Sequence, residues 1–175
     1  MKIVSPADRN KRHIRAAVLG TGRIGSSLEN DRLREKPASH AGAISNNRET
    51  LLVAGADPDP DARAAFAKRW KLPATQVFES AETLLATVHP DLVHISCDTK
   101  AHIPLLLSCL EKHVPVIVLE KPIGSTLEEA RSALPRVQAA EKNGTSRVIV
   151  NHERRFAADY RQLREIIQSE ELGAL

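Results

Sequence analysis

The chain has 175 residues, of which 42% are apolar and 3% aromatic, and its formal net charge is +3. That length suits one domain with a short extension, and the charge does not indicate a nucleic-acid binder, because no basic face interleaved with aromatic residues is visible. No apolar run approaches the roughly 18 residues of a membrane span, and the charged start lacks the apolar stretch of a signal peptide.

Residues 1–13 carry four basic residues against a single acid, which accounts for the whole net charge of the chain. This stretch predicts a flexible basic leader ahead of the domain. Cys97 and Cys109 stand twelve residues apart, without a CxxC pattern or a neighbouring ligand pair. They are typical of reduced, buried thiols, and we expect a cytoplasmic protein without membrane attachment.

From residue 14 onward, short apolar runs alternate with amphipathic stretches. We expect the last long helix to begin at a capping box from Ser125 to Glu128, to be kinked at Pro135 and to end at Asn143-Gly144. Strands that are apolar throughout and separated by helices predict a doubly wound α/β fold, with a parallel sheet covered on both faces. The predicted strands are 14–20, 51–57, 91–96, 115–120 and 146–151, and the predicted helices are 24–30, 59–70, 101–113 and 125–144.

The first strand runs into a glycine-rich turn of the form G-x-G-x-x-G. Gly20 allows the tight turn, Gly22 lets the backbone approach a pyrophosphate, and Gly25 allows the following helix to pack on the strand. Arg23 and Ile24 lie within the motif, at the helix end that attracts negative charge. The turn predicts a dinucleotide-binding Rossmann fold, and the alternative is an ordinary strand-to-helix turn with incidental glycines.

Asp57 ends the second strand, where a carboxylate can accept hydrogen bonds from the adenosine ribose of a dinucleotide. It follows Gly25 by 32 residues, against about 20 in the usual spacing, and the excess lies in a polar insertion at 30–39. A carboxylate suits two free ribose hydroxyls and repels a 2′-phosphate. Arg63, the nearest following arginine, lies a turn into the next helix. We therefore expect NAD as the cofactor, with NADP as the alternative.

Glu120, Lys121 and Pro122 stand at the carboxyl end of the run 115–120, the edge at which open parallel sheets bind ligands. A lysine in that place can donate or accept a proton at an alcohol or carbonyl oxygen while a hydride moves to or from a nicotinamide. Pro122 fixes the turn that presents it. The alternative interpretation is a surface ion pair at the end of a strand.

These stretches together resemble the N-terminal half of the Gfo/Idh/MocA family of NAD(P)-dependent oxidoreductases. The resemblance rests on residues 17–25, 53–70, the EKP at 120–122 and residues 150–156, which follow one another in the family's order. It covers nearly all of the chain from residue 14 onward, and the EKP after an apolar strand is specific in combination with the glycine turn.

The resemblance implies that Lys121 is the catalytic lysine, that Glu120 supports it near the nicotinamide, and that a cis peptide precedes Pro122. The loop that begins at Ser96 is expected to contact the cofactor, although this chain has Ser-Cys-Asp-Thr where the family usually has a Thr-Pro type sequence. His102 matches a histidine that commonly opens the helix after the fourth strand. It either contacts the cofactor or is satisfied by the local backbone.

Family enzymes continue into a second domain that carries the substrate pocket, and we expect that domain to be absent from this chain. Residues 14–152 then form the dinucleotide-binding domain, and 153–175 form an exit helix whose uncovered apolar face favours a homo-oligomer. The resemblance implies an NAD(P)-dependent oxidoreductase of a sugar, polyol or related compound, here as a nucleotide-binding half that does not turn over substrate alone. The alternatives are a non-catalytic dinucleotide-binding or regulatory module and a purely structural α/β domain.

The histidines show no metal-ligand spacing, and no zinc or calcium pattern is present in the sequence. His94 lies within a predicted buried strand and is expected to be a hydrogen-bonded core residue, whereas His40 is expected in a loop or at a helix end. Arg154 and Arg155 are interpreted as the solvated start of the last helix, with a role on the substrate or cofactor side as the alternative.

Overall fold

The computed structural model describes residues 13–169 and residue 173, so residues 1–12 of the predicted leader lie outside the described residues. Six parallel strands form one sheet in the order β3-β2-β1-β4-β5-β6. This is the strand order of the doubly wound dinucleotide-binding fold, as predicted. The strands are β1 (Ile14–Leu19), β2 (Thr50–Ala56), β3 (Val77–Phe78), β4 (Leu92–Ile95), β5 (Val116–Glu120) and β6 (Arg147–Asn151).

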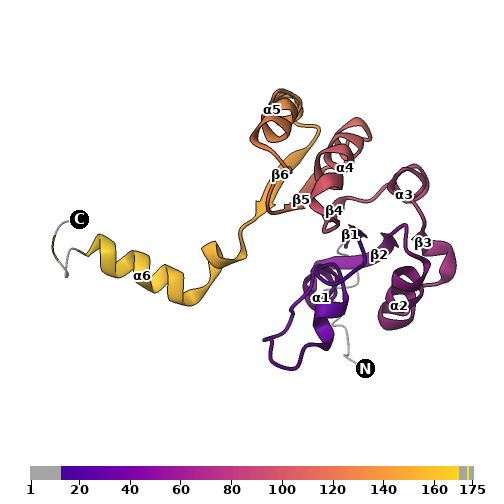
Figure 1. Cartoon of the computed structure of the whole chain (residues 1–175), viewed down its shortest axis with the longest axis horizontal. Coiled ribbons are helices and arrows are strands. Elements are labelled where there is room, and N and C mark those ends of the chain that lie inside the picture. Colours follow the sequence, from indigo (N-terminus) through magenta and orange to yellow (C-terminus); the bar gives the residue numbers. More distant parts are fainter. Residues whose placement is uncertain (1–12, 170–172, 174–175) are drawn as a thin grey trace.

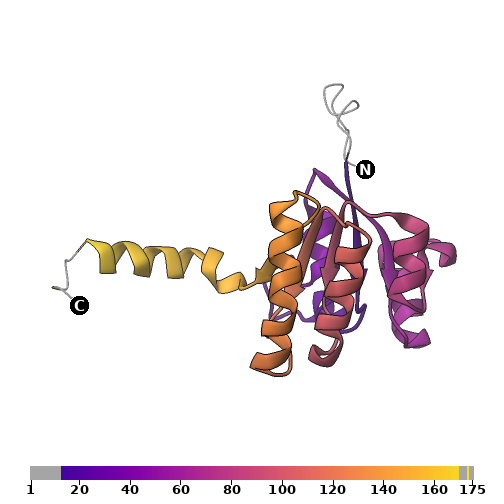
Figure 2. The ribbon, with the colours of Figure 1, turned by 90° about the horizontal axis from the view of Figure 1, so that it is seen from above.

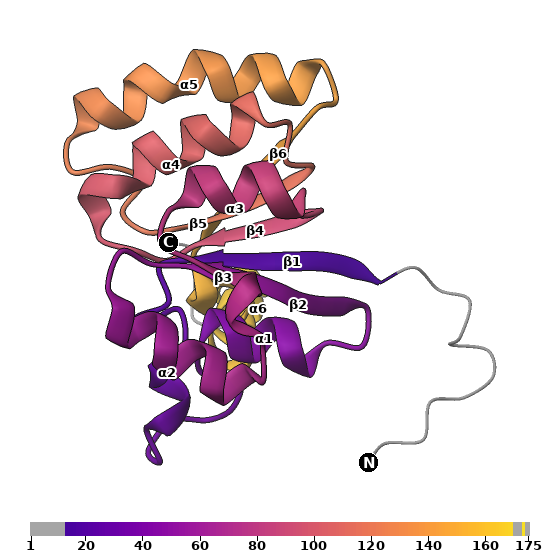
Figure 3. The same ribbon diagram turned by 90° about the vertical axis from the view of Figure 1, so that its right-hand side faces the viewer.

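Helices cover both faces of the sheet (Figure 3). On one face lie α1 (His40–Asn46) and α2 (Pro60–Trp70), and on the other lie α3 (Ala81–Val88), α4 (Thr99–Glu111) and α5 (Leu127–Lys142). The sheet separates two apolar clusters, because neighbouring side chains of a strand point to opposite faces. Val18 belongs to the cluster with Phe66 of α2, whereas Leu19 belongs to the cluster with Leu106 of α4. Aliphatic side chains and alanines make up most of both clusters, as the composition requires.

The strand β3 and the helix α3, which lie between β2 and β4, were not predicted from the sequence. The strand β3 has only two residues, which is too short to show a periodic pattern. The helix α3 begins after Ser80, whose Oγ accepts a hydrogen bond from the backbone N–H of Thr83 at 3.3 Å. Serine at that position is a recognisable helix-start signal, so α3 could have been found.

The prediction of a helix at 24–30 was wrong. These residues form a turn followed by the short 3₁₀ helix Ser27–Asn30, and α1 begins only at His40. Ser39 caps α1, with its Oγ accepting a hydrogen bond from the N–H of Gly42 at 3.1 Å.

The reason is a looped-out segment in what would otherwise be one helix. The N–H groups of His40 and Ala41 donate to the carbonyls of Ile24 and Gly25, at 3.1 and 2.9 Å. In an uninterrupted α-helix those carbonyls accept from the residues four positions later, which are numbers 28 and 29. The chain thus leaves the helix and rejoins it, and residues 28–39 form an insertion of twelve residues. Without it, the spacing from the glycine turn to the acid after β2 is the usual one of about 20 residues.

The cap of α5 lies one residue later than predicted. Oγ1 of Thr126, not of Ser125, accepts from the N–H of Glu129 at 3.1 Å, and Oε2 of Glu129 accepts from the N–H of Ser125 at 2.7 Å. This pairing holds Ser125 outside the helix. Pro135 lies within α5, which continues to Lys142 before the chain turns at Gly144.

The last helix, α6 (Ala158–Gln168), extends away from the sheet and its covering helices (Figures 1 and 2). It follows a short 3₁₀ helix, η4 (Glu153–Phe156). Tyr160, Leu163 and Ile167 of α6 are 45–51% exposed. Among the helices that the structure describes, none has the length and apolar character needed to cross a membrane.

Candidate functional site

Two adjoining pockets open at the carboxyl ends of the strands, with volumes of about 850 and 470 Å³. Arg23, Ile24, Ser96 and Cys97 line both pockets, so the two meet beside the ends of β1 and β4. The strand order reverses at this point of the sheet, which is where doubly wound folds bind their ligands. The smaller pocket lies toward β2, and the larger one lies toward β5.

The three glycines of the turn have different surroundings. Gly20 has a φ of +88°, and a Cβ there would lie 2.5 Å from the backbone nitrogen of Cys97. A Cβ on Gly25 would overlap with the carbonyl oxygen of Gly20. At Gly22, by contrast, nothing lies within 4 Å of the Cβ position. Gly20 and Gly25 are therefore required by the fold of the turn itself, whereas Gly22 leaves open space beside the backbone, as a closely approaching phosphate needs.

Asp57 lines the smaller pocket and lies next to the glycine turn. Its Oδ2 accepts hydrogen bonds from the N–H and Oγ1 of Thr21, at 2.7 and 3.2 Å, and its Oδ1 accepts from the N–H of Asp59 at 3.0 Å. The sequence placed Arg63 a turn away, but the structure brings its Nη1 to the carbonyls of Asp57 and Pro58, at 2.8 and 2.9 Å. Nη1 of this guanidinium is thus directed at the backbone.

Ser96 and His102 tie the loop after β4 to its neighbours. Oγ of Ser96 donates to the carbonyl of Gly20 at 2.9 Å, which joins this loop to the glycine turn. The ring of His102 is 1% exposed, and its Nδ1 and Nε2 face the carbonyls of Pro122 and Cys97, at 2.7 and 3.2 Å. His102 therefore joins the loop after β4 to the turn after β5, and both ring nitrogens face backbone acceptors.

Cys97 is a free thiol between the two pockets, and burial raises its pKa to about 11. The thiol form, rather than the thiolate nucleophile, is therefore present at neutral pH.

Glu120 and Lys121 line the larger pocket, and the peptide bond between Lys121 and Pro122 is cis, as the resemblance implies. Oε1 of Glu120 accepts from Nε2 of His40 at 2.9 Å and from Nδ2 of Asn151 at 2.5 Å, while Oε2 accepts from the N–H of Lys121 at 3.1 Å. Burial raises the pKa of Glu120, but these hydrogen bonds outweigh burial and lower it to about 2. Glu120 is therefore a fixed carboxylate beneath Lys121.

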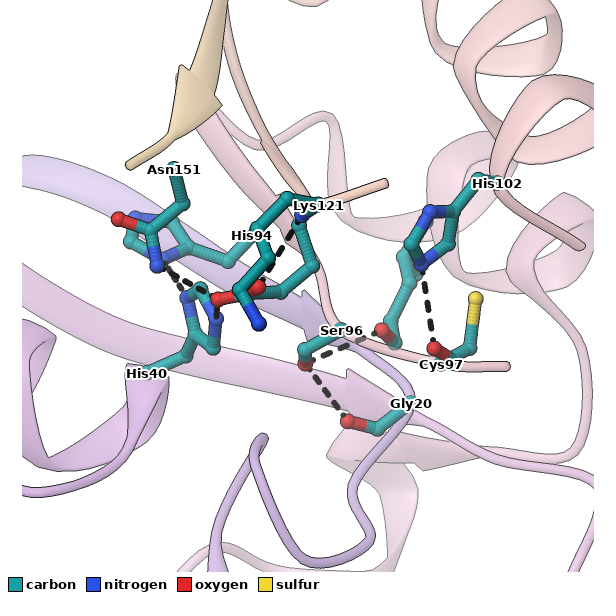
Figure 4. A network of polar contacts seen from close by, with 10 residues as sticks. Gly20, His40, His94, Ser96, Cys97, His102, Lys121 and Asn151 are labelled. Carbon is teal, nitrogen blue, oxygen red and sulfur yellow. Dashed lines mark hydrogen bonds and ion pairs between the residues drawn. The ribbon is translucent and has the colours of Figure 1, made fainter. Parts of the chain in front are cut away.

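A second histidine completes this network (Figure 4). Nδ1 of His40 lies 2.7 Å from Nδ1 of His94, so one of these two atoms carries the proton. Because Nε2 of His40 donates to the carboxylate of Glu120, a neutral His40 ring has a bare Nδ1, which accepts from Nδ1–H of His94. Burial, together with the nearby His40, lowers the pKa of His94 to about 3, so this ring stays neutral.

The network was missed by the sequence interpretation, apart from His94 as a hydrogen-bonded residue and Glu120 as a supporting one. His40 is 6% exposed at the start of α1, and no local pattern marked it because the insertion separates it from the glycine turn. Arg154 lines the larger pocket, and its Nη1 also contacts the hydroxyl of Tyr160 at 3.1 Å. Among the described residues, no group of three or more His, Cys, Asp or Glu side chains could hold a metal ion.

Comparison with known proteins agrees with this geometry. Residues 14–152 match the model of the Gfo/Idh/MocA family, described as an oxidoreductase family with an NAD-binding Rossmann fold. Over 162 residues the chain is 30% identical to an inositol 2-dehydrogenase of Corynebacterium glutamicum, a match that covers 93% of this chain and 43% of that protein. The chain thus spans less than half the length of this relative.

Solved structures share the fold. The myo-inositol 2-dehydrogenase of Lactobacillus plantarum superimposes with a TM-score of 0.78 at 18% identity, over 94% of this chain and 43% of that one. The scyllo-inositol dehydrogenase of Lactobacillus casei, solved with bound NAD(H) and scyllo-inositol, gives a TM-score of 0.74 at 21% identity, over 93% and 43% of the two chains.

Proposed function

The chain belongs to the Gfo/Idh/MocA family of oxidoreductases, and we propose that it acts in an NAD-dependent dehydrogenase of a sugar or polyol. One observation carries the proposal: Lys121 lines a pocket of about 850 Å³ that adjoins the glycine turn. Within the described residues, Nζ of Lys121 makes no hydrogen bond or ion pair, so it is available to a ligand. This supports a role in catalysis over the alternative of a surface ion pair at the end of β5.

NAD fits the smaller pocket and the glycine turn. The open space at Gly22 accommodates a pyrophosphate, with Arg23 and Ile24 lining both pockets beside it. Asp57 offers a carboxylate to ribose hydroxyls, and Nη1 of Arg63 is held by backbone carbonyls instead of facing a 2′-phosphate. These contacts favour NAD over NADP. When bound, the nicotinamide supplies the hydride acceptor.

Lys121 and the residues around it have separate roles in the proposed reaction, which are proton transfer and positioning. Nζ of Lys121 takes the proton of the substrate hydroxyl as the carbinol carbon loses its hydride, and returns it in the reverse reaction. Glu120 holds the backbone N–H of Lys121, and Asn151 and His40 hold Glu120. Ser96 and His102 join the three loops that surround the pockets. They therefore hold the cofactor and the lysine in fixed positions relative to each other.

The proposal also includes the cellular compartment and the oligomeric state of the protein. Cys97 and Cys109 are both free thiols, which supports a reducing compartment, the cytoplasm. The exposed apolar residues Tyr160, Leu163 and Ile167 on α6 support a homo-oligomer in solution.

The test is a comparison of Lys121→Met with Lys68→Met, which removes an exposed lysine of α2, in the protein expressed from its complete gene. NAD reduction is followed at 340 nm with a panel of inositols, aldoses and alditols. We expect Lys121→Met to lower kcat by roughly 10²- to 10⁴-fold, with an unchanged Kd for NADH by fluorescence titration, and Lys68→Met to change neither.

Full activity of Lys121→Met would contradict the proposal. Tight NADH binding by a wild-type protein that oxidises no member of the panel would instead favour the non-catalytic dinucleotide-binding module.

A further inference from the structure

The inserted segment 28–39 is held in a fixed shape by hydrogen bonds from two of its own side chains. Oε1 of Glu29 accepts from the N–H of Ala38 at 2.7 Å and from the N–H and Oγ of Ser39 at 3.0 and 3.1 Å. Nζ of Lys36 donates to the carbonyls of Leu28 and Asp31, at 3.3 and 2.7 Å. Two charged side chains thus bond to backbone groups within the insertion itself.

The insertion forms part of the lining of the larger pocket. Leu33, Arg34, Glu35 and Pro37 line this pocket together with Lys121. Leu33 is 96% exposed, which is unusual for a leucine in a segment so closely tied. The pocket beside the catalytic lysine therefore has a wall that comes from the nucleotide-binding part of the protein itself.

Two segments of the pocket lining each contribute neighbouring residues of opposite charge. The insertion contributes Arg34 next to Glu35, and η4 contributes Glu153 next to Arg154. Nε of Arg34 lies 3.9 Å from Asp31, and its side chain is 62% exposed, so this contact is weak and the guanidinium remains available. Each pair combines hydrogen-bond donors with acceptors, whereas neither segment offers an excess of positive charge.

We propose that the insertion is a substrate-recognition element, which binds a neutral polyhydroxylated ligand through Arg34 and Glu35. A hydroxyl group both donates and accepts, so vicinal hydroxyls match an arginine beside a glutamate. At the insertion itself, a carboxylate on the ligand would meet one glutamate beside one arginine and gain no net attraction from this pair. Leu33 and Pro37 offer apolar surface to the C–H groups of the same ligand. This inference rests on the proposed function, because it assumes that the larger pocket holds the substrate.

The experiment uses the protein expressed from its complete gene and four variants. Arg34→Ala and Glu35→Ala remove the proposed contacts, and Arg32→Ala is the matched control, because Arg32 is an exposed residue of the same segment that does not line the pocket. The fourth variant deletes residues 28–39 and joins Ser27 to His40, which leaves the N–H groups of His40 and Ala41 facing the carbonyls that they contact. KM and kcat are measured with inositols and aldoses and with the corresponding uronic acids, and the Kd for NADH is measured by fluorescence.

For the preferred neutral substrate, we expect KM to rise roughly 10-fold in Arg34→Ala and in Glu35→Ala, since each loses a hydrogen bond to a charged group. The deletion should lower kcat/KM by roughly 100-fold, the product of the two losses. Neither kcat of the point variants nor the Kd for NADH should change, and Arg32→Ala should behave as wild type.

Equal KM values for Arg34→Ala and Arg32→Ala would overturn the assignment, as would a wild-type preference for uronic acids over the neutral compounds. If the deletion variant does not fold, the KM values of the three point variants test the proposal without it. A failure of the proposed function itself is visible beforehand, since the wild-type protein would then oxidise none of these compounds.

Discussion

The glycine turn consists of backbone beside open space, whereas the surroundings of Lys121 are built from side chains of four separate elements. Gly20, Gly22 and Gly25 lie within six consecutive residues. At the other end of the cleft, the carboxylate of Glu120 on β5 is held by His40 of α1 and Asn151 of β6, with His94 of β4 behind His40.

The two ends should therefore respond differently to substitution. At Gly22, a side chain would fill the space that the ligand needs without a cost to folding, because no atom of the chain lies within 4 Å of its Cβ position. A side-chain network responds to the loss of a partner, because a buried polar group is then left unpaired. The following predictions test this difference, beginning with the largest expected effect.

Gly22→Val should abolish NADH binding and leave the fold intact. The new side chain points into space where no atom of the chain lies within 4 Å of its Cβ, so it obstructs the pyrophosphate alone. We expect the Kd for NADH to rise by at least about 100-fold, on the order of the loss of two charge-assisted contacts. Fluorescence titration measures the affinity, and circular dichroism at increasing temperature monitors the fold. Wild-type affinity in this variant would show that the turn does not hold the dinucleotide.

Gly25→Ala, in contrast to Gly22→Val, should lower the stability of the fold, because it disturbs the turn itself. Its Cβ overlaps with the carbonyl oxygen of Gly20, so the backbone has to shift. We expect a loss of about 1–3 kcal/mol in the free energy of unfolding, as for other overpacked sites. Gly22→Ala is the matched control and should be close to wild type in urea unfolding. Equal stability of the two variants would mean that the close approach at Gly25 is not a constraint.

Asp57→Asn should change cofactor preference more than stability. The amide oxygen can still accept from the N–H of Thr21, but the negative charge that repels a 2′-phosphate is gone. We expect the ratio of the Kd for NADH to that for NADPH to rise about 10-fold, which corresponds to roughly 1.4 kcal/mol. Asp61→Asn, at an exposed position in the first turn of α2, serves as the control. A ratio that moves toward NADH would reverse the assigned role of Asp57.

At the Lys121 end, stability should decrease as the pH falls below about 6.5. The unfolded chain binds a proton at His94 near the ordinary pKa of 6.5, whereas the folded chain does so only near 3, so acid favours unfolding through this window. Glu120 adds to the loss from its ordinary pKa of 4.5 downward, toward its folded value of about 2. Each group contributes at most about 1.4 kcal/mol per pH unit.

Melting temperatures between pH 7.5 and pH 5 measure the effect of His94 above the pH range in which Glu120 contributes. His94→Asn keeps a donor toward His40 and removes the titrating ring, so its melting temperature should depend less on pH. His152→Asn, at an exposed histidine, should keep the wild-type dependence. An unchanged slope in His94→Asn would mean that His94 is not the group that acid protonates.

Residue patterns along the chain predict those parts of this protein that local backbone chemistry dictates. Apolar runs, the glycine turn, Asp57 and the Glu-Lys-Pro at a strand end were predicted in the right order, because strand burial and tight turns leave marks on neighbouring residues. Which distant side chains meet depends on long-range packing. Asn151 reaches Glu120 because β5 and β6 pair with these two residues in register. His40 reaches both Glu120 and His94 because α1 resumes on the carbonyls of Ile24 and Gly25 after twelve inserted residues. The local sequence predicts neither the register between two strands nor the residue at which a helix resumes after an insertion, because both are set by contacts between distant parts of the chain.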